Sequence, residues 1–330
     1  MTVTLKDIAQ ITGVSINTVS HALKNKPDIG KATAREIQET AARLGYRPNL
    51  AARNLVLRKT FTIGLAVNEI DNPVRVEFCE KLRTLAAADG YRLLTAPLAD
   101  NWTGSIGDLL DHHVDGLIVG AVWDHACEQA AKTFLPECRR NRIPFILFGK
   151  TAGHDADCVE IDLEHSVYLL TGHLLERGCR DIALFAPSRN AANFRGYSRA
   201  MTDAGLGNAI RRIDLSSGRM EPAYDEMNMF LTSGKKPPRA LIAANDLAAL
   251  GAMRALREHQ IRIPAQCAVA GVDNIAFARY ANPSLTSVGF DNGACAATVW
   301  ELMKQRLDTP GDYSPVSIAI RQKLFIREST

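Results

Sequence analysis

The chain has 330 residues, of which 46% are hydrophobic and 23% are charged, so it can bury a sizeable core and divide into two or three globular units. It shows no signal-peptide pattern and no run of about 18 uncharged apolar residues, so we expect a soluble cytoplasmic protein that does not contact a membrane. The net charge is +3, but residues 1–60 contain ten Lys and Arg against four Asp and Glu, an excess that suits a polyanion such as DNA.

Two short helices separated by a glycine turn are predicted at the start of the chain. Thr4 can cap the first helix, with Asp7 three residues later as in a capping box, and this helix should end at Gly13. Ser15 can cap the second helix. The inner face of that helix carries Val19 and Leu23, and its outer face carries Ile16, Asn17, Ser20 and His21. This pattern predicts a helix-turn-helix that offers short polar side chains to the major groove of DNA.

A third helix is expected from about Lys31 to Leu44. Ile37 and Ala41 would close the small core with Leu44, while Gly45 would end the helix and Tyr46 would cover it. On periodicity alone, a three-helix packing module without a DNA partner is an alternative interpretation.

The segment VTLKDIAQITGVSINTVSHALKNKPDIGKATAREIQETAARLGYRPNLAARNL closely resembles the DNA-binding headpiece of the lactose-repressor (LacI/GalR) family of transcription regulators. The resemblance implies that Ile16, Asn17 and His21 read base edges, and that Ser15, Thr18, Ser20, Asn25 and Tyr46 hold phosphates. It also places Thr4, Leu5, Asn49, Ala52 and Leu55 at the DNA. Many members have arginine where this chain has His21, so operator affinity that varies with pH is a minor hypothesis.

Residues 48–59, PNLAARNLVLRK, are compatible with a helix that is too short to be stable alone in water. In the family this hinge helix pairs with its twin in the minor groove and inserts a leucine between base steps, and Leu55 matches that leucine. The alternative is a linker that packs on its own domain.

From Phe61 onward, short apolar runs alternate with helical patterns, which predicts α/β architecture with parallel sheets. The runs are FTIGLAV, YRLLTAPL, DGLIVGAV, PFILFG, VEIDL, DIALFAP, IRRIDL, ALIAAN, CAVAGV and TSVGF. No aligned GxGxxG or GxSxG motif is present, and Gly149-Lys150-Thr151 lacks the earlier glycine of a Walker A loop. We therefore expect a protein that is not an enzyme and has no cofactor.

No metal site is expected either. His112 and His113, flanked by Asp111 and Asp115, resemble a solvated helix end more than a ligand set. The cysteines are odd in number and never spaced as CxxC, so buried free thiols are favoured over disulfides or a zinc cluster. They are Cys79, Cys127, Cys138, Cys158, Cys179, Cys267 and Cys295.

The rest of the chain resembles the periplasmic-binding-protein-like core of the same family. The resemblance implies a headpiece at 1–48, a hinge helix and linker at 49–60, and an effector-binding and dimerisation core at 61–330. Within the core, an N-subdomain would span about 61–161 and 291–318, and a C-subdomain about 162–290 and 319–330. A ligand would bind between them, outside the carboxyl ends of the strands.

Matches within this core supply the expected effector contacts, which are Asn72, Arg75, Trp123, Lys150, Arg195, Met220, Asn245 and Asp273. Arg195 stands where the family holds effector oxygens, and Met220 where several relatives have an aromatic ring. Arg75, Lys150 and Arg195 could converge on an anion, which suggests a sugar acid or sugar phosphate. The alternatives are that Arg75 and Lys150 are solvated rim charges and that Trp123 packs in the wall rather than stacking on a sugar.

These features predict a repressor of a carbohydrate or sugar-acid utilisation operon. A homodimer would bind a pseudo-palindromic operator in double-stranded DNA at the nucleoid, and no heptad tail follows residue 326 to make a tetramer. Release by an inducer is favoured over a corepressor-dependent regulator of another pathway. A solute-binding protein would share the core but not residues 1–60.

Overall fold

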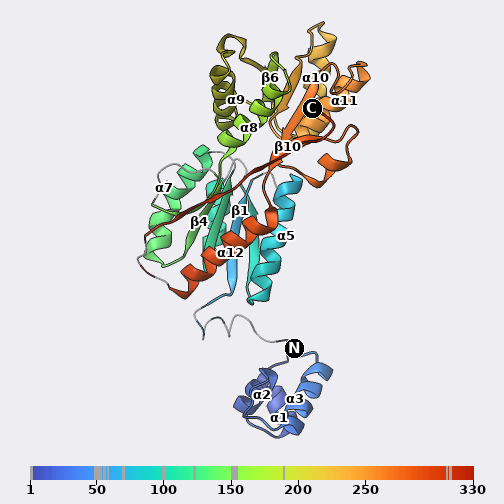
Figure 1. Ribbon diagram of the computed structural model, residues 1–330. Helices are drawn as coiled ribbons and strands as arrows, with labels where there is room; N and C mark the ends of the chain where they lie inside the picture. The colour runs from blue at the N-terminus through green and yellow to red at the C-terminus, as the bar shows by residue number, and fades with distance from the viewer. Residues whose placement is uncertain are drawn as a thin grey trace. The chain divides into compact units, whose positions relative to one another are not determined.

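A computed structural model describes residues 3–47, 54, 57, 59–68, 71–98, 102–121, 124–149, 155–188, 190–309, 311 and 314–330. The chain forms two compact units, Met1–Thr60 and Phe61–Thr330 (Figure 1).

Within residues 3–47, the first unit forms three helices. They are α1 (Leu5–Thr12), α2 (Ile16–Leu23) and α3 (Lys31–Arg43). The predicted helix ends are confirmed, because Gly13 and Gly45 have φ angles of 67° and 64°, a region that favours glycine. The core consists of Ile8, Ala9, Val19, Ala22, Ile37 and Ala41. The predicted inner residue Leu23 lies only partly buried at the edge of this core, and Ala22, three residues after Val19, is buried instead.

The second unit contains two sheets, and we call the parts built on them lobe 1 and lobe 2. The strands of lobe 1 are β1 (Thr62–Val67), β2 (Arg92–Pro97), β3 (Gly116–Ala121), β4 (Phe145–Gly149), β5 (Asp157–Ile161) and β11 (Ser317–Ile320). They are all parallel, in the order β11-β5-β4-β3-β1-β2. Every residue of β1 and β4 is buried, as expected for parallel strands covered on both faces.

The side chains of lobe 1 alternate between two apolar clusters, one on each face of its sheet. Ile118 and Ile146 contribute to the cluster that is covered by α5 (Pro73–Ala88) and α12 (Asn292–Asp308). Leu117 and Leu147, their neighbours in sequence, contribute to the cluster covered by α6 (Trp102–Asp111) and α7 (Asp124–Arg140). Each fully buried Leu or Ile stabilises the lobe by about 1.5–3 kcal/mol.

Lobe 2 has a second six-stranded sheet. Its strands are β6 (Ile182–Ala186), β7 (Arg211–Asp214), β8 (Ala240–Ala243), β9 (Ala268–Val272), β10 (Thr286–Gly289) and β12 (Lys323–Phe325), in the order β12-β10-β9-β8-β6-β7. Only β12 is antiparallel among these pairings. Helix α8 (Leu163–Glu176) packs with α9 (Ala191–Asp203), and α10 (Met220–Thr232) with α11 (Asp246–Glu258). Two short 3-10 helices occupy Gly207–Ala209 and Ala276–Tyr280.

The chain passes from one sheet to the other after β5, after β10 and after β11. The segment that contains β11 and β12 runs between the two lobes in Figure 1. All ten predicted strands are present, although the strand expected from Val159 begins earlier, at Asp157. The sequence did not predict β11 and β12, because they are short and partly exposed and so lack a continuous buried pattern.

No helix in the described part of the chain is both long enough and apolar enough to cross a bilayer. The described residues also contain no group of three or more His, Cys, Asp or Glu side chains placed to hold a metal ion. His112 and His113 are exposed at the end of α6, as predicted. Cys138, Cys158, Cys179, Cys267 and Cys295 are buried free thiols, and Cys79 is half-buried.

Candidate nucleic-acid interface and ligand site

The caps of α1 and α2 fix the turn between these helices. Asp7 accepts hydrogen bonds from the backbone N–H and the hydroxyl of Thr4, each 2.8 Å long. The Ser15 hydroxyl accepts from the backbone N–H of Thr18 at 3.0 Å, and the two side-chain oxygens lie 2.8 Å apart. That contact uses only one of the two hydroxyl protons, so the other can reach a phosphate at the amino end of α2, where the helix dipole favours anions.

The outer face of α2 presents predicted DNA contacts to solvent. Ile16 is 49% exposed, Asn17 is exposed and Ser20 is half-buried, whereas Val19 and Ala22 are fully buried on the opposite face. An amide that projects from the first turn of a helix can pair with the edge of a base in the major groove. The surface of α2 is therefore built as a helix-turn-helix requires.

His21 is held by a partner that the sequence analysis missed. Its Nδ1 lies 2.6 Å from an oxygen of Asp28, in the turn before α3, and the contact lowers the pKa of the Asp28 carboxyl. The His21 side chain is 24% exposed. Because Nδ1 is engaged, Nε2 is the nitrogen left for a base edge. A neutral imidazole bonded in this way accepts a hydrogen bond at Nε2, and its cation donates one.

Other predicted DNA contacts also have structural partners. Asn25 has a φ of 54° and its side-chain oxygen accepts from Gln38 at 2.8 Å. Leu5 and Tyr46 pack against the core of the first unit, and burial raises the pKa of the Tyr46 hydroxyl. Thr4 is exposed at the start of α1. Asn49, Ala52 and Leu55 lie outside the described residues.

Asn72 and Asp273, two of the expected effector contacts, come together from different lobes. Asn72 caps α5, where its Oδ1 accepts from the backbone N–H of Val74, and its Nδ2 donates to Asp273 at 3.2 Å. Asp273 follows β9 with a φ of 108°, a region that favours glycine. A second contact between the lobes joins Arg219 to Asp71 at 3.0 Å.

Arg75, in the first turn of α5, is buried and only 7% exposed, so the alternative of a solvated rim charge is wrong for this residue. Its guanidinium carbon lies 5.5 Å from the centre of the Phe148 ring. Its Nε is buried without a hydrogen-bond partner among the residues that the structure describes. Lys150 and Trp123, two other predicted contacts, lie outside those residues.

Two buried amides that the sequence did not indicate lie at the same edge of lobe 1. Asn68 follows β1 directly, is 4% exposed, and both of its side-chain polar atoms lack a partner in the described part of the chain. Asn292 begins α12, where its Nδ2 donates to Glu77 at 2.9 Å and its Oδ1 has no described partner. A polar residue immediately after the apolar run IGLAV is the only signal that pointed to Asn68.

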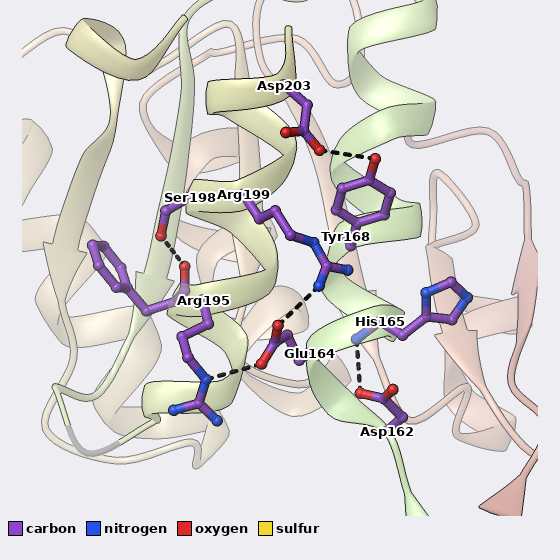
Figure 2. Close-up of polar contacts among 9 residues, drawn as sticks. Asp162, Glu164, His165, Tyr168, Arg195, Ser198, Arg199 and Asp203 are labelled. Carbon is purple, nitrogen blue, oxygen red and sulfur yellow. Dashed lines mark hydrogen bonds and ion pairs between the residues drawn. The ribbon is translucent and has the colours of Figure 1, made fainter.

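Arg195 already has a protein partner, whereas the sequence suggested that it would converge with Arg75 and Lys150 on a bound anion. Figure 2 shows that Glu164 of α8 lies between Arg195 and Arg199 of α9. The Nε of Arg195 lies 2.9 Å from one carboxylate oxygen of Glu164, and Nη1 of Arg199 lies 3.0 Å from the other. Arg199 also lies over the Tyr168 ring, whose hydroxyl donates to Asp203 at 3.1 Å. The Arg195 side chain is 47% exposed, and it shares the single carboxylate of Glu164 with Arg199. Convergence of Arg195 with Arg75 on one anion is therefore less favourable than the sequence implied.

Met220 and Asn245 lie at the amino ends of α10 and α11. Met220 is 43% exposed, and Asn245 caps α11 by accepting from the backbone N–H of Ala248 at 2.9 Å. The next residue, Asp246, is fully buried and accepts from the backbone N–H of Ile275 at 2.8 Å and from the Ser287 hydroxyl at 2.6 Å. Burial raises the pKa of Asp246 well above its usual value. Asp246 thus positions the turn after β9, which carries Asp273.

Comparison with known proteins gives consistent matches along the whole chain. The family model for bacterial regulatory proteins of the lacI family matches residues 4–49, and that for a periplasmic binding protein-like domain matches residues 171–330. The HTH-type transcriptional repressor PurR of Erwinia tasmaniensis is 30% identical over 338 residues, covering 99% of this chain and 96% of the relative.

Two solved structures share the fold. The Lac repressor dimer bound to operator and the anti-inducer ONPF has a TM-score of 0.84 at 23% identity and covers 100% of this chain and 99% of its own. The complex of the transcriptional regulator CelR with cellobiose has a TM-score of 0.69 at 24% identity. The match covers 99% of this chain and 100% of the CelR chain.

Proposed function

The chain belongs to the lacI family of bacterial regulatory proteins, and from this premise we propose that it represses a carbohydrate or sugar-acid utilisation operon and is released from its operator by a small effector. It is a DNA-binding transcriptional repressor with an effector-binding core, and it is not an enzyme. We place its site of action in the cytoplasm, at the nucleoid.

The proposed division of labour follows the predicted boundaries. Residues 1–48 read the operator, 49–60 form the hinge helix and linker, and 61–330 bind effector and dimerise. The exposed face of α2 carries the DNA-binding part of the proposal, because Asn17 projects to solvent from a helix that Ser15 caps. Two headpieces in a homodimer would meet the two half-sites of a pseudo-palindromic operator.

The effector would bind next to the carboxyl ends of the strands, where the two lobes approach each other. Asn72 and Asp273 meet there, and Met220 and Asn245 begin the two helices that pack together in lobe 2. The name of the CelR complex, a regulator with cellobiose bound, supports a sugar or sugar derivative. A ligand that bridges the lobes can change DNA affinity only by favouring one arrangement of the lobes over another.

Selection of bound sequences from random DNA tests the operator part of the proposal. We expect a pseudo-palindromic site to be enriched, and Asn17→Ala to reduce preference for one base pair in each half-site by roughly 10-fold. Asn141→Ala, an exposed turn residue of lobe 1, is the matched control and should leave the site unchanged. Recovery of DNA without a common two-fold site would contradict the proposal.

Fluorescence anisotropy of the labelled operator tests the effector part. Neutral sugars, sugar acids, sugar phosphates and a purine base are each titrated into the preformed complex. Release of the operator by a sugar or sugar acid is the expected result. A ligand that instead strengthens operator binding would support a corepressor-dependent regulator of another pathway.

A further inference from the structure

We propose that lobe 1 contains a preformed site for the anionic group of the effector, in which the buried guanidinium of Arg75 binds a carboxylate or phosphate with help from Asn68 and Asn292. The inference rests on the proposed function insofar as the ligand is the effector that binds between the lobes. It places the anionic group of the ligand in lobe 1, next to three residues that the sequence did not indicate as one site.

The first observation is that Arg75 is a buried cation with no counter-ion among the residues that the structure describes. The side chain is 7% exposed, and no hydrogen bond or ion pair of its guanidinium occurs among the described residues. The contrast is Arg306, which is 9% exposed and is bound by both oxygens of Asp157 at 2.8 Å. Buried arginines are normally paired, because an isolated charge loses its hydration without compensation.

The surroundings of Arg75 hold it in place without neutralising it. The guanidinium lies over the Phe148 ring, and this ring stacks on Phe78 with 4.4 Å between centroids. Arg75 is also near the thiols of Cys79 and Cys295, but burial raises the pKa of both, to about 12 for Cys295, so they carry no negative charge at neutral pH. The aromatic face therefore holds the guanidinium in place, and its positive charge can bind an anionic group of a ligand.

The second observation is that the unpartnered amides lie at the same edge of the sheet. Val67, Gly120 and Phe148 are aligned across β1, β3 and β4, so Asn68 emerges at the carboxyl edge where Arg75 covers Phe148. Asn292 starts α12, the helix that packs beside α5. Ligands of open parallel sheets bind at this edge.

The chemistry of these groups specifies the ligand class. The Nε–H of Arg75 and the amide N–H of Asn68 can both donate to an anionic oxygen, and a planar guanidinium suits carboxylate or phosphate. The remaining acceptors, Oδ1 of Asn68 and Oδ1 of Asn292, need donors, which sugar hydroxyl groups supply. A hydroxylated acid or a sugar phosphate satisfies all four groups, whereas a neutral sugar leaves the cation unpaired.

The test compares the full-length chain with Arg75→Met and, as a matched control on the same helix, Arg83→Met, whose exposed side chain pairs with Glu80. Glucose, gluconate, glucose 6-phosphate and inorganic phosphate are titrated by calorimetry. We expect an anionic probe to bind, with affinity reduced roughly 10- to 100-fold in Arg75→Met and unchanged in Arg83→Met. A neutral sugar that binds more tightly than every anion, or equally well to Arg75→Met, would overturn the assignment.

Thermal unfolding without ligand gives an independent readout. Removing an unpaired buried charge should raise the Tm of Arg75→Met by about 3 °C or more, and inorganic phosphate should raise the Tm of the original chain but not that of the variant. A lower Tm in Arg75→Met, or failure of this variant to fold, would show that Arg75 has a structural partner and would refute the site. If the site passes both tests but no anion changes operator affinity, the anion site stands and the proposed effector control fails.

Discussion

Replacing Arg306 by methionine should destabilise the second unit, because it leaves the carboxylate of Asp157 buried without its partner. The two side chains are 9% and 0% exposed, and they share two hydrogen bonds of 2.8 Å. Asp157 also accepts from the backbone N–H of Val316 at 3.0 Å, so the pair ties α12 and the start of β5 to the segment before β11. Removing one member of such a pair costs about 3–5 kcal/mol.

Urea denaturation measures this cost as a fall in the midpoint of about 1–2 M, if the slope of the transition stays the same. The double variant Asp157→Asn with Arg306→Met removes both charges and keeps an acceptor for Val316, so it should be more stable than Arg306→Met alone. A loss of less than about 1 kcal/mol in the single variant, or a double variant that is no more stable, would refute the reasoning.

Three further substitutions test separate parts of the structure. A Cβ at Gly196 would overlap the backbone oxygen of Glu164, so Gly196→Ala should cost about 1–3 kcal/mol in urea unfolding, whereas Gly172→Ala, which has open space in α8, should gain about 0.5–1 kcal/mol. Burial raises the pKa of Asp246 in the folded chain, so the fold loses stability as pH rises above about 4, where the unfolded carboxyl ionises and the folded one stays protonated. The stability of Asp246→Asn relative to the original chain should therefore increase as pH rises above about 4 in urea unfolding, and a difference that does not change with pH would contradict this. Asp28→Asn weakens the hydrogen bond that orients the imidazole of His21. The ratio of operator affinity to random-DNA affinity, measured by anisotropy, should therefore fall roughly 3- to 10-fold. An unchanged ratio would show that this contact does not position a residue that reads bases.

Local sequence patterns were sufficient for most of the elements and for the exposed face of α2. The cap at Ser15, the glycine at Gly13 and the outward position of Asn17 each depend on residues within one or two turns of the same helix. The ten predicted strands followed from apolar runs, since a parallel sheet buries both faces of its strands. The strands β11 and β12 were missed because their exposure depends on neighbours distant in the sequence.

Only the tertiary structure decided which charges are compensated. The sequence suggested that Arg75 and Arg195 converge on one anion, yet Arg195 pairs with Glu164 while Arg75 is buried on Phe148. The Asp28 contact of His21 was likewise invisible in the pattern of α2. The caps and apolar runs that predicted the helices and the ten strands are local in sequence, whereas the environment of a charge depends on which distant segments the fold brings against it.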